Sequence, residues 1–159
     1  MRIVVVLALP RDAASVPLVR HTAKEALVRA GVTNECAEEV EVAVSEACTN
    51  AYRHAQSGDS FEVVLNVGDD DLTIDVMDDG TGVPTGLPAV MPSPSADGGR
   101  GVSLMAAFCD QVVFDSVTGY GGWVRLRKRL RWADDAPFHG RCTHRERRLR
   151  SVQQREGTG

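Results

Sequence analysis

Residues 40–54 read VEVAVSEACTNAYRH, and this stretch decides how the rest of the chain is interpreted. Its apolar residues recur at helical spacing and predict one buried face: Val40, Val44, Ala47 and Ala51. Glu46, Asn50 and His54 follow one another at intervals of four, which places them along one flank of that face. Glu46 and Asn50 are then either edge-of-core groups satisfied by nearby backbone, or the proton acceptor and oxygen ligand of a pocket.

Length and composition indicate one ordinary globular domain. The chain has 159 residues, of which 43% are hydrophobic and 25% are charged. No apolar run approaches the roughly 20 residues that a membrane-spanning helix needs. The apolar opening at 1–9 is short, carries Arg2 and lacks a small-residue cleavage site, so it predicts a strand rather than a signal peptide. We therefore expect a cytoplasmic protein that does not enter a membrane.

The charges are distributed unevenly along the chain. Residues 1–130 hold 11 basic and 18 acidic side chains, a net charge of −7. Residues 131–159 hold 7 basic and 4 acidic side chains, a net charge of +3. Such an acidic globular part does not fit direct nucleic-acid binding. The composition predicts a domain at 1–130, followed by a basic and disordered tail at 131–159.

The cysteines do not form a metal-binding pattern. They stand far apart, without a CxxC pair and without a matching histidine spacing: Cys36, Cys48, Cys109 and Cys142. Zinc is therefore not expected. The spacing favours reduced thiols of a cytoplasmic protein.

The order of the expected elements is strand, helix, helix, two strands, loop, helix and two strands. The strands are expected at 2–9, 61–67, 72–77, 111–116 and 122–130, and the helices at 15–30, at 34–55 and after Gly98. Both strand pairs are hairpins, so the fold class is α/β (α+β): a two-layer sandwich with a mixed, mostly antiparallel sheet and helices on one face. The proline-rich loop at about 83–98 is expected to be a lid.

Two short glycine motifs carry chemistry that fits a nucleotide. Asp78 precedes Gly80-x-Gly82 at a strand end, where a carboxylate can accept a hydrogen bond from an exocyclic amine such as that of adenine. Residues 99–101 read GRG at the start of a helix, where backbone N–H groups and a basic side chain can bind phosphate. Each motif alone is also typical of a plain turn.

Taken together, the order and spacing of these motifs are far more specific. Glu46-x-x-x-Asn50, then the motif at 78–82, then a lid, then 99–101 resembles the N, G1 and G2 boxes of the GHKL ATPases, which have the Bergerat fold. Within that superfamily, SEACTNAYRH at 45–54 and GRGVSLM at 99–105 resemble the anti-sigma factor serine/threonine kinases. The resemblance covers about residues 1–130.

The resemblance implies an ATP site that uses Mg²⁺. Asn50 would hold Mg²⁺ through its amide oxygen. Asp78 would read the adenine amine, with Gly80 and Gly82 letting the base approach. The residues that would cradle phosphate are Gly99, Arg100 and Gly101.

The resemblance also implies partners and a catalytic carboxylate. Proteins of this bacterial family bind a sigma factor and phosphorylate an anti-anti-sigma factor. Glu46 would orient or deprotonate the attacking serine hydroxyl. Arg20 matches a basic position on the family's partner-binding face. A homodimer is compatible with the sequence, which does not define the oligomeric state.

One position departs from the family pattern. The family usually has Gly-Thr where this chain has Gly122-Trp123, and the threonine helps to bind nucleotide near Asp78. Either Trp123 stacks on or beside the adenine, or the affinity is reduced, or the site is degenerate. The alternative to a kinase is a module that sequesters a partner protein, with ATP as a structural ligand or absent.

Overall fold

The computed structural model describes residues 2–54, 58–79, 99–117 and 121–138. The expected lid therefore lies outside the described residues, as do Gly80 and Gly82. The elements, in chain order, are β1 (Ile3–Pro10), α1 (Ser15–Ala30), α2 (Asn34–His54), β2 (Ser60–Val67), β3 (Asp71–Asp78), α3 (Gly99–Phe108), β4 (Gln111–Val117) and β5 (Gly121–Arg129).

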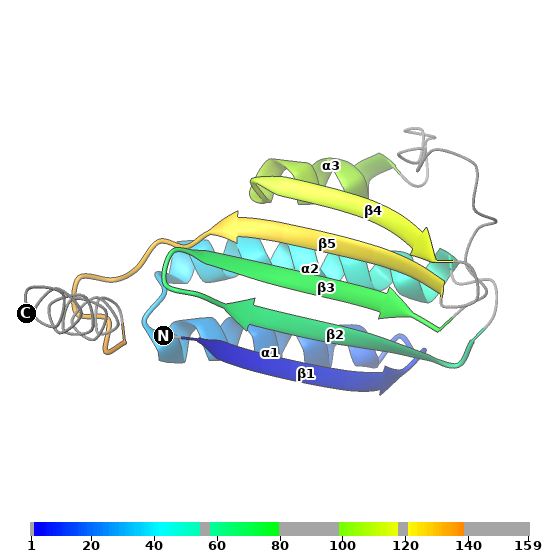
Figure 1. Cartoon of the computed structure of the whole chain (residues 1–159), viewed down its shortest axis with the longest axis horizontal. Helices are drawn as coiled ribbons and strands as arrows, with labels where there is room; N and C mark the ends of the chain where they lie inside the picture. Colours follow the sequence, from blue (N-terminus) through cyan, green and yellow to red (C-terminus); the bar gives the residue numbers. More distant parts are fainter. Residues whose placement is uncertain (1, 55–57, 80–98, 118–120, 139–159) are drawn as a thin grey trace, which may run out of the picture.

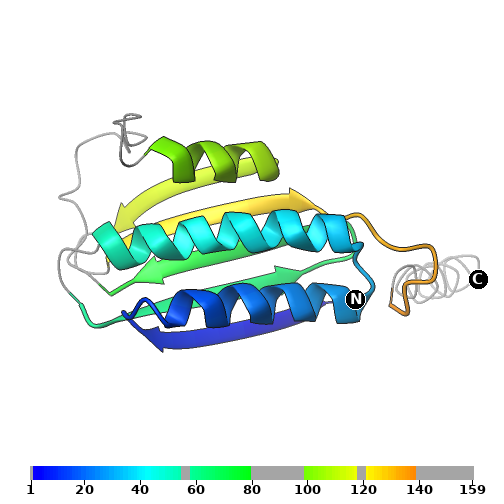
Figure 2. The same cartoon turned by 180° about the vertical axis from the view of Figure 1, so that it is seen from behind.

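The five described strands form one sheet, covered on one face by the three described helices (Figures 1 and 2). The strand order is β1-β2-β3-β5-β4, and each pair of neighbours runs antiparallel. Figure 2 shows α1 over β1 and β2, α2 over the middle of the sheet, and α3 beside β4. The predicted two-layer sandwich is confirmed, and the described strands pair more uniformly than the expected mixed sheet.

The core lies between α2 and the helix-facing side of the sheet. The predicted apolar face of α2 is buried as a continuous stripe that includes Val40, Val44, Ala47 and Ala51. Alternate strand residues oppose it: Val63, Leu65, Val67, Leu72, Ile74, Val76, Val124 and Leu126. Burying this apolar surface is the main force that holds α2 against the sheet. The polar flank that carries Glu46 and Asn50 is thereby fixed relative to the strand ends.

The chain beyond residue 130 does not leave the fold at once. Thr33 N–H donates to the Arg131 carbonyl at 2.8 Å, and the Trp132 indole N–H donates to the Asp69 carbonyl at 2.7 Å. Gly31 has φ +97°, and a Cβ there would lie 2.6 Å from the Ala136 Cβ. Residues 131–138, which follow the boundary expected at residue 130, therefore pack on the α1–α2 turn and the β2–β3 hairpin.

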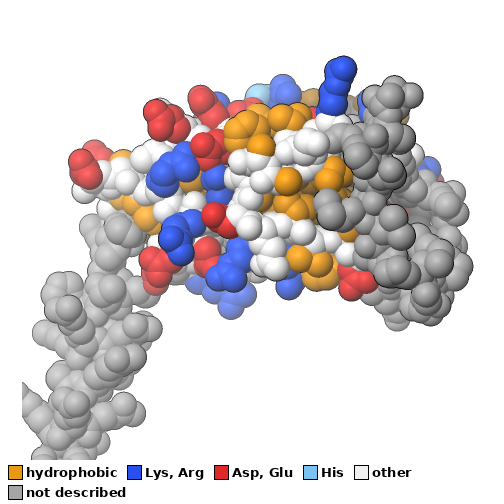
Figure 3. Space-filling model, turned by 90° about the horizontal axis from the view of Figure 1, so that it is seen from above, with side chains coloured by type: hydrophobic (Ala, Val, Ile, Leu, Met, Phe, Trp, Pro, Cys, Tyr) orange, Lys and Arg blue, Asp and Glu red, His pale blue; other side chains and the backbone are white. Residues whose placement is uncertain are grey.

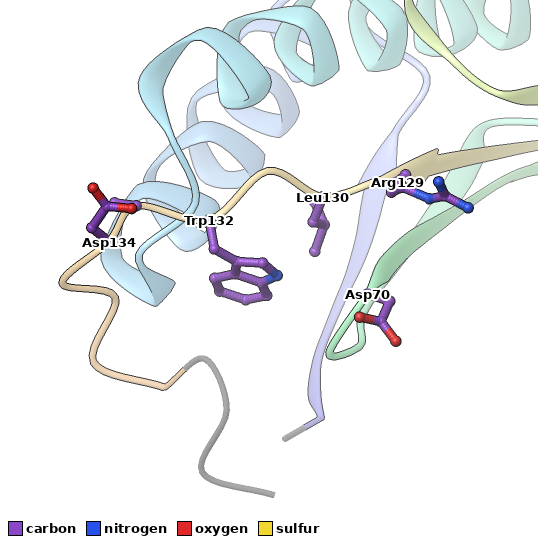
Figure 4. A pocket seen from close by; sticks show the side chains of 6 residues that line it. Asp70, Arg129, Leu130, Trp132 and Asp134 are labelled. Atoms are coloured by element: carbon purple, nitrogen blue, oxygen red, sulfur yellow. The ribbon is translucent and has the colours of Figure 1, made fainter. Parts of the chain in front are cut away.

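This packing leaves a hollow of about 720 Å³ at the end of the sheet that bears the C-terminal segment (Figure 4). Its lining comes from the hairpin and from the segment after β5: Asp70, Arg129, Leu130, Trp132, Ala133 and Asp134. The motif residues Asp78 and Gly101 lie at the opposite end of the molecule, where β3 ends and α3 begins (Figure 1). The hollow is thus remote from the predicted site.

Figure 3 looks onto α3 and the β4 edge, where apolar side chains gather beside charged groups. Leu104 on α3 is 36% exposed. Across the described part of the chain, none of the helices combines the length and the apolar character needed to cross a membrane.

Candidate nucleotide-binding site

The predicted site lies where four elements meet at one end of the molecule. The C-terminal half of α2, the end of β3 and the first residues of α3 and β5 come together there (Figure 1). Antiparallel pairing brings the end of β3 beside the start of β5, and α2 packs directly against α3. Residues that are distant in sequence are thereby brought to one edge of the fold.

Glu46 and Asn50 lie on α2, one turn apart, and both are half-buried. Neither side chain forms a hydrogen bond with another residue in the described ranges, whereas the neighbouring Thr49 hydroxyl donates to the Ser45 carbonyl at 2.7 Å. The edge-of-core interpretation required local partners for Glu46 and Asn50, and the described structure provides none. Their oxygens are therefore available to a ligand or a partner protein.

The Glu46 carboxylate lies against the first turn of α3. A Cβ built on Gly101 would lie 2.6 Å from Glu46 Oε2, closer than real Cβ contacts come. Gly101 is buried, and no left-handed φ requires a glycine there. The requirement for glycine at this position is therefore steric, and the side chain that imposes it is Glu46.

Asp78 lies against the first two residues of β5. A Cβ on Gly122 would lie 2.7 Å from Asp78 Oδ2. Gly121 has φ +90°, and a Cβ on it would overlap the Asp78 side chain and carbonyl. Two consecutive glycines thus give the Asp78 carboxylate its space, and sequence reasoning did not identify them as part of the site.

The adjacent Asp79 has a different, structural role. Its carboxylate accepts a hydrogen bond from the Ser60 hydroxyl at 2.8 Å and another from the Ser60 backbone N–H at 3.2 Å. The Ser60 hydroxyl is the main cause that holds the pKa of Asp79 below its usual value. Asp79 therefore ties the end of β3 to the start of β2.

Trp123 does not lie beside Asp78. Its indole N–H donates to Asp75 Oδ1 at 3.1 Å, and the Arg125 guanidinium lies 4.5 Å from the centre of its ring. Arg125 binds the same Asp75 carboxylate through two hydrogen bonds of 2.6 and 2.9 Å. Because side chains alternate along a strand, these three residues lie on the face away from the helices, opposite to buried Val124.

The indole is held on the face of β5 away from the helices, which weighs against stacking on an adenine at Asp78. The β5 residue on which a Cβ would face the Asp78 carboxylate is Gly122, and neither 122 nor 123 carries a hydroxyl. The sequence contains a signal for this orientation. Because Val124 and Leu126 alternate with polar residues, they predict that Gly122 faces the helices and that Trp123 faces away from them.

Gly99 and Arg100 lie at the start of a helix, as the sequence predicts, and their role in binding phosphate stays a prediction. Gly99 begins α3, and Arg100 follows it with an exposed side chain. No group of three or more His, Cys, Asp or Glu in the described ranges could hold a metal ion by itself. A Mg²⁺ at Asn50 would therefore need phosphate oxygens as further ligands, which suits an ion that shares its ligands with ATP.

Arg20 lies apart from this edge, in a cluster of charges between α1 and α2. Its Nε lies 3.9 Å from Glu41 Oε1 and is buried without a hydrogen bond within the described residues. Lys24 also reaches Glu41, at 3.1 Å, and this carboxylate is the main cause that raises the pKa of Lys24. The Arg20 side chain is still 43% exposed, so it could contact a partner.

Comparison with known proteins agrees with this geometry. Residues 9–128 match the family described as histidine kinase-like ATPase domain. An anti-sigma F factor of Clostridium acetobutylicum is 32% identical over 110 residues, covering 65% of this chain and 77% of that protein. The serine-protein kinase RsbW of Bacillus subtilis is 33% identical over 122 residues, covering 69% and 76%.

A solved structure shares the fold. The structure of the RsbU and RsbW domains of Rv1364c from Mycobacterium tuberculosis superposes with a TM-score of 0.63 at 19% identity. The match covers 82% of this chain but only 34% of that one, so this chain spans about a third of its length. The resemblance to the anti-sigma factor serine/threonine kinases is confirmed, and the chain belongs to the histidine kinase-like ATPase domain family.

Proposed function

We propose that this protein is an ATP-dependent serine/threonine kinase that also acts as an anti-sigma factor in the bacterial cytoplasm. It binds a sigma factor and phosphorylates an anti-anti-sigma factor, so that the partners exchange. The observation that carries the proposal is the convergence of the Glu46 carboxylate, the first turn of α3 and Asp78 at one end of the fold. The names of the relatives, anti-sigma F factor and serine-protein kinase, support it.

In this proposal the nucleotide is held by Asp78 and by the start of α3. Asp78 accepts a hydrogen bond from the exocyclic amine of adenine, and Gly122 leaves the base room to approach. The first turn of α3 faces the phosphates, to which Arg100 adds a positive charge. ATP supplies the phosphoryl group, and Asn50 would hold in part a Mg²⁺ that would neutralise phosphate charge.

Glu46 acts on the partner's serine. The serine oxygen forms a bond to the γ-phosphorus, while the bond from that phosphorus to the bridging oxygen breaks and ADP leaves with the electron pair. The serine proton passes to Glu46. A half-buried carboxylate without a hydrogen-bond partner among the described residues suits this role.

One observation favours a second candidate, a module that binds partners without transferring phosphate. Trp123 stands where the family pattern has a threonine, so a hydroxyl expected near the base is absent. Such a module would use the α1–α2 surface around Arg20 to sequester the sigma factor and would hold ATP weakly.

The test uses the purified chain, γ-labelled ATP with Mg²⁺, and the anti-anti-sigma factors encoded in the genome that carries this chain. The wild type should label one of them. Glu46→Gln should lower the transfer rate by about 10²–10⁴-fold, with ATP affinity measured by calorimetry unchanged. Glu38→Gln, an exposed carboxylate of the same helix, is the matched control. Tight partner binding without label transfer by the wild type would establish the binding module instead.

A further inference from the structure

We propose that Gly101 is a positioning residue for Glu46: the hydrogen in place of a side chain at 101 provides the space that the catalytic carboxylate occupies. The inference rests on the proposed kinase function and deepens it. It gives Gly101 a steric role toward Glu46, distinct from the backbone contact with phosphate that the GRG motif implies.

The contact itself is specific. A Cβ on Gly101 would lie 2.6 Å from Glu46 Oε2 but 3.6 Å from Glu46 Cδ and 3.7 Å from Glu46 Cβ. The overlap is therefore confined to the carboxylate end of the side chain. Among the described residues beyond the neighbours of Gly101 in α3, the atom nearest to that Cβ is Glu46 Oε2.

The fold can tolerate a side chain at 101, but the carboxylate cannot stay where it is. Gly101 does not adopt a left-handed φ, and alanine is a better helix former than glycine, so Gly101→Ala does not strain α3. The atom that has to move is the end of a flexible Glu46 side chain, which can turn away at small cost. Gly101→Ala thus displaces Glu46 without unfolding the protein.

Displacing Glu46 should affect transfer and not nucleotide binding. The backbone N–H that can face a phosphate is the same in glycine and alanine. The acceptor for the serine proton, in contrast, moves by about an ångström, and errors of this size can cost on the order of 10²-fold in rate. We expect Gly101→Ala to lower kcat for transfer at least tenfold, with the Kd for ATP within about threefold of wild type.

A shorter carboxylate makes the test specific to this contact. In Glu46→Asp the side chain is one methylene shorter and no longer fills the space beside residue 101. Gly101→Ala should therefore change kcat by less than about twofold in the Glu46→Asp background, although it changes kcat at least tenfold in the wild type. This non-additivity is the signature of two residues in direct contact.

Gly122→Ala is the matched control, because it crowds the carboxylate at the other end of the site. Its Cβ would lie 2.7 Å from Asp78 Oδ2, so it should weaken ATP binding and leave the Glu46 carboxyl undisturbed. The carbon-13 shift of the Glu46 carboxyl, measured by NMR without nucleotide, should change in Gly101→Ala and stay constant in Gly122→Ala. This readout does not depend on activity.

The outcomes separate the inference from the function on which it rests. If the wild type transfers phosphate and Gly101→Ala does so at the same rate, the inference is overturned and the kinase stands. If Gly101→Ala weakens ATP binding tenfold in both backgrounds, Gly101 serves the nucleotide directly and the inference is again overturned. If the wild type transfers no phosphate, the proposed function fails and the positioning role with it, even where the carboxyl shift reports the contact.

Discussion

Replacing Trp123 by threonine tests which face of β5 the nucleotide uses. The resemblance to the family suggested that a threonine here would restore a missing contact with ATP. In the structure the indole is bound to Asp75 and Arg125 on the face away from the helices. We therefore expect Trp123→Thr to lower the stability of the fold and to leave ATP affinity within about twofold of wild type.

The size of the stability loss follows from two contacts. The indole N–H donates at 3.1 Å to a carboxylate whose side chain is only 12% exposed, and hydrogen bonds to charged groups contribute about 1.5–3 kcal/mol. The lower end applies, because Asp75 keeps both hydrogen bonds from Arg125. The stacked guanidinium is 47% exposed and adds about 0.5–1 kcal/mol. Threonine suits a strand, so the net loss should be about 2 kcal/mol.

Thermal unfolding and calorimetry measure the two quantities on the same samples. A loss of about 2 kcal/mol should lower Tm by roughly 5–10 °C in a domain of this size. Trp123→Phe keeps a ring under Arg125 but loses the N–H donor, and should lose about half as much stability. A Kd for ATP that changes tenfold or more while Tm stays constant would show that the indole contacts the nucleotide, which would refute the placement of the site.

Three further predictions concern single carboxyl and amide groups. Asp78→Asn removes the charge from the acceptor of the adenine amine, and should weaken ATP binding by ten- to a hundredfold in calorimetry, the equivalent of about 1.5–3 kcal/mol. Asn50→Ala should reduce both Mg²⁺-dependent ATP binding and phosphate transfer, whereas ATP binding measured with EDTA should not change. Glu39 has its pKa lowered mainly by Arg131 and then by Lys128, so its contribution to stability is full above its ordinary pKa of 4.5 and is lost as pH falls through the lowered value. Glu39→Gln should therefore lower Tm at pH 7 and flatten the decline of Tm in acid; an unchanged acid profile would contradict this.

The sequence predicts the features of this fold that depend on local spacing. The buried face of α2 follows from apolar residues three and four apart, and the polar flank at Glu46 and Asn50 follows from the same period. The sheet follows from two hairpins with alternating residues. The chain order of the three boxes was enough to identify the family. The helical and strand signals are local in the sequence, and the order of the three boxes matches the order found in a known family.

The features that the sequence did not reveal depend on contacts between distant residues. Trp132 binds the Asp69 carbonyl across the fold, so the packing of 131–138 cannot be inferred from the basic composition of the C-terminal region. The steric relation of Gly101 to Glu46 joins residues 55 positions apart and likewise has no local signal. Trp123 is a different case, because the alternation of buried Val124 and Leu126 along β5 already turns position 123 away from the helices.

Gly122 is best understood together with Asp78. A Cβ at 122 would lie 2.7 Å from Asp78 Oδ2, so a threonine could not be added while the carboxylate stays in this position. Gly121, with φ +90°, provides the rest of the space and tolerates no side chain without strain. The Asp78 carboxylate thus occupies room that a side chain at 122 would need. If Asp78 recognises the base as we propose, it does so without a hydroxyl beside it on β5, and a threonine at 122 would have to displace the carboxylate before it could help to bind ATP.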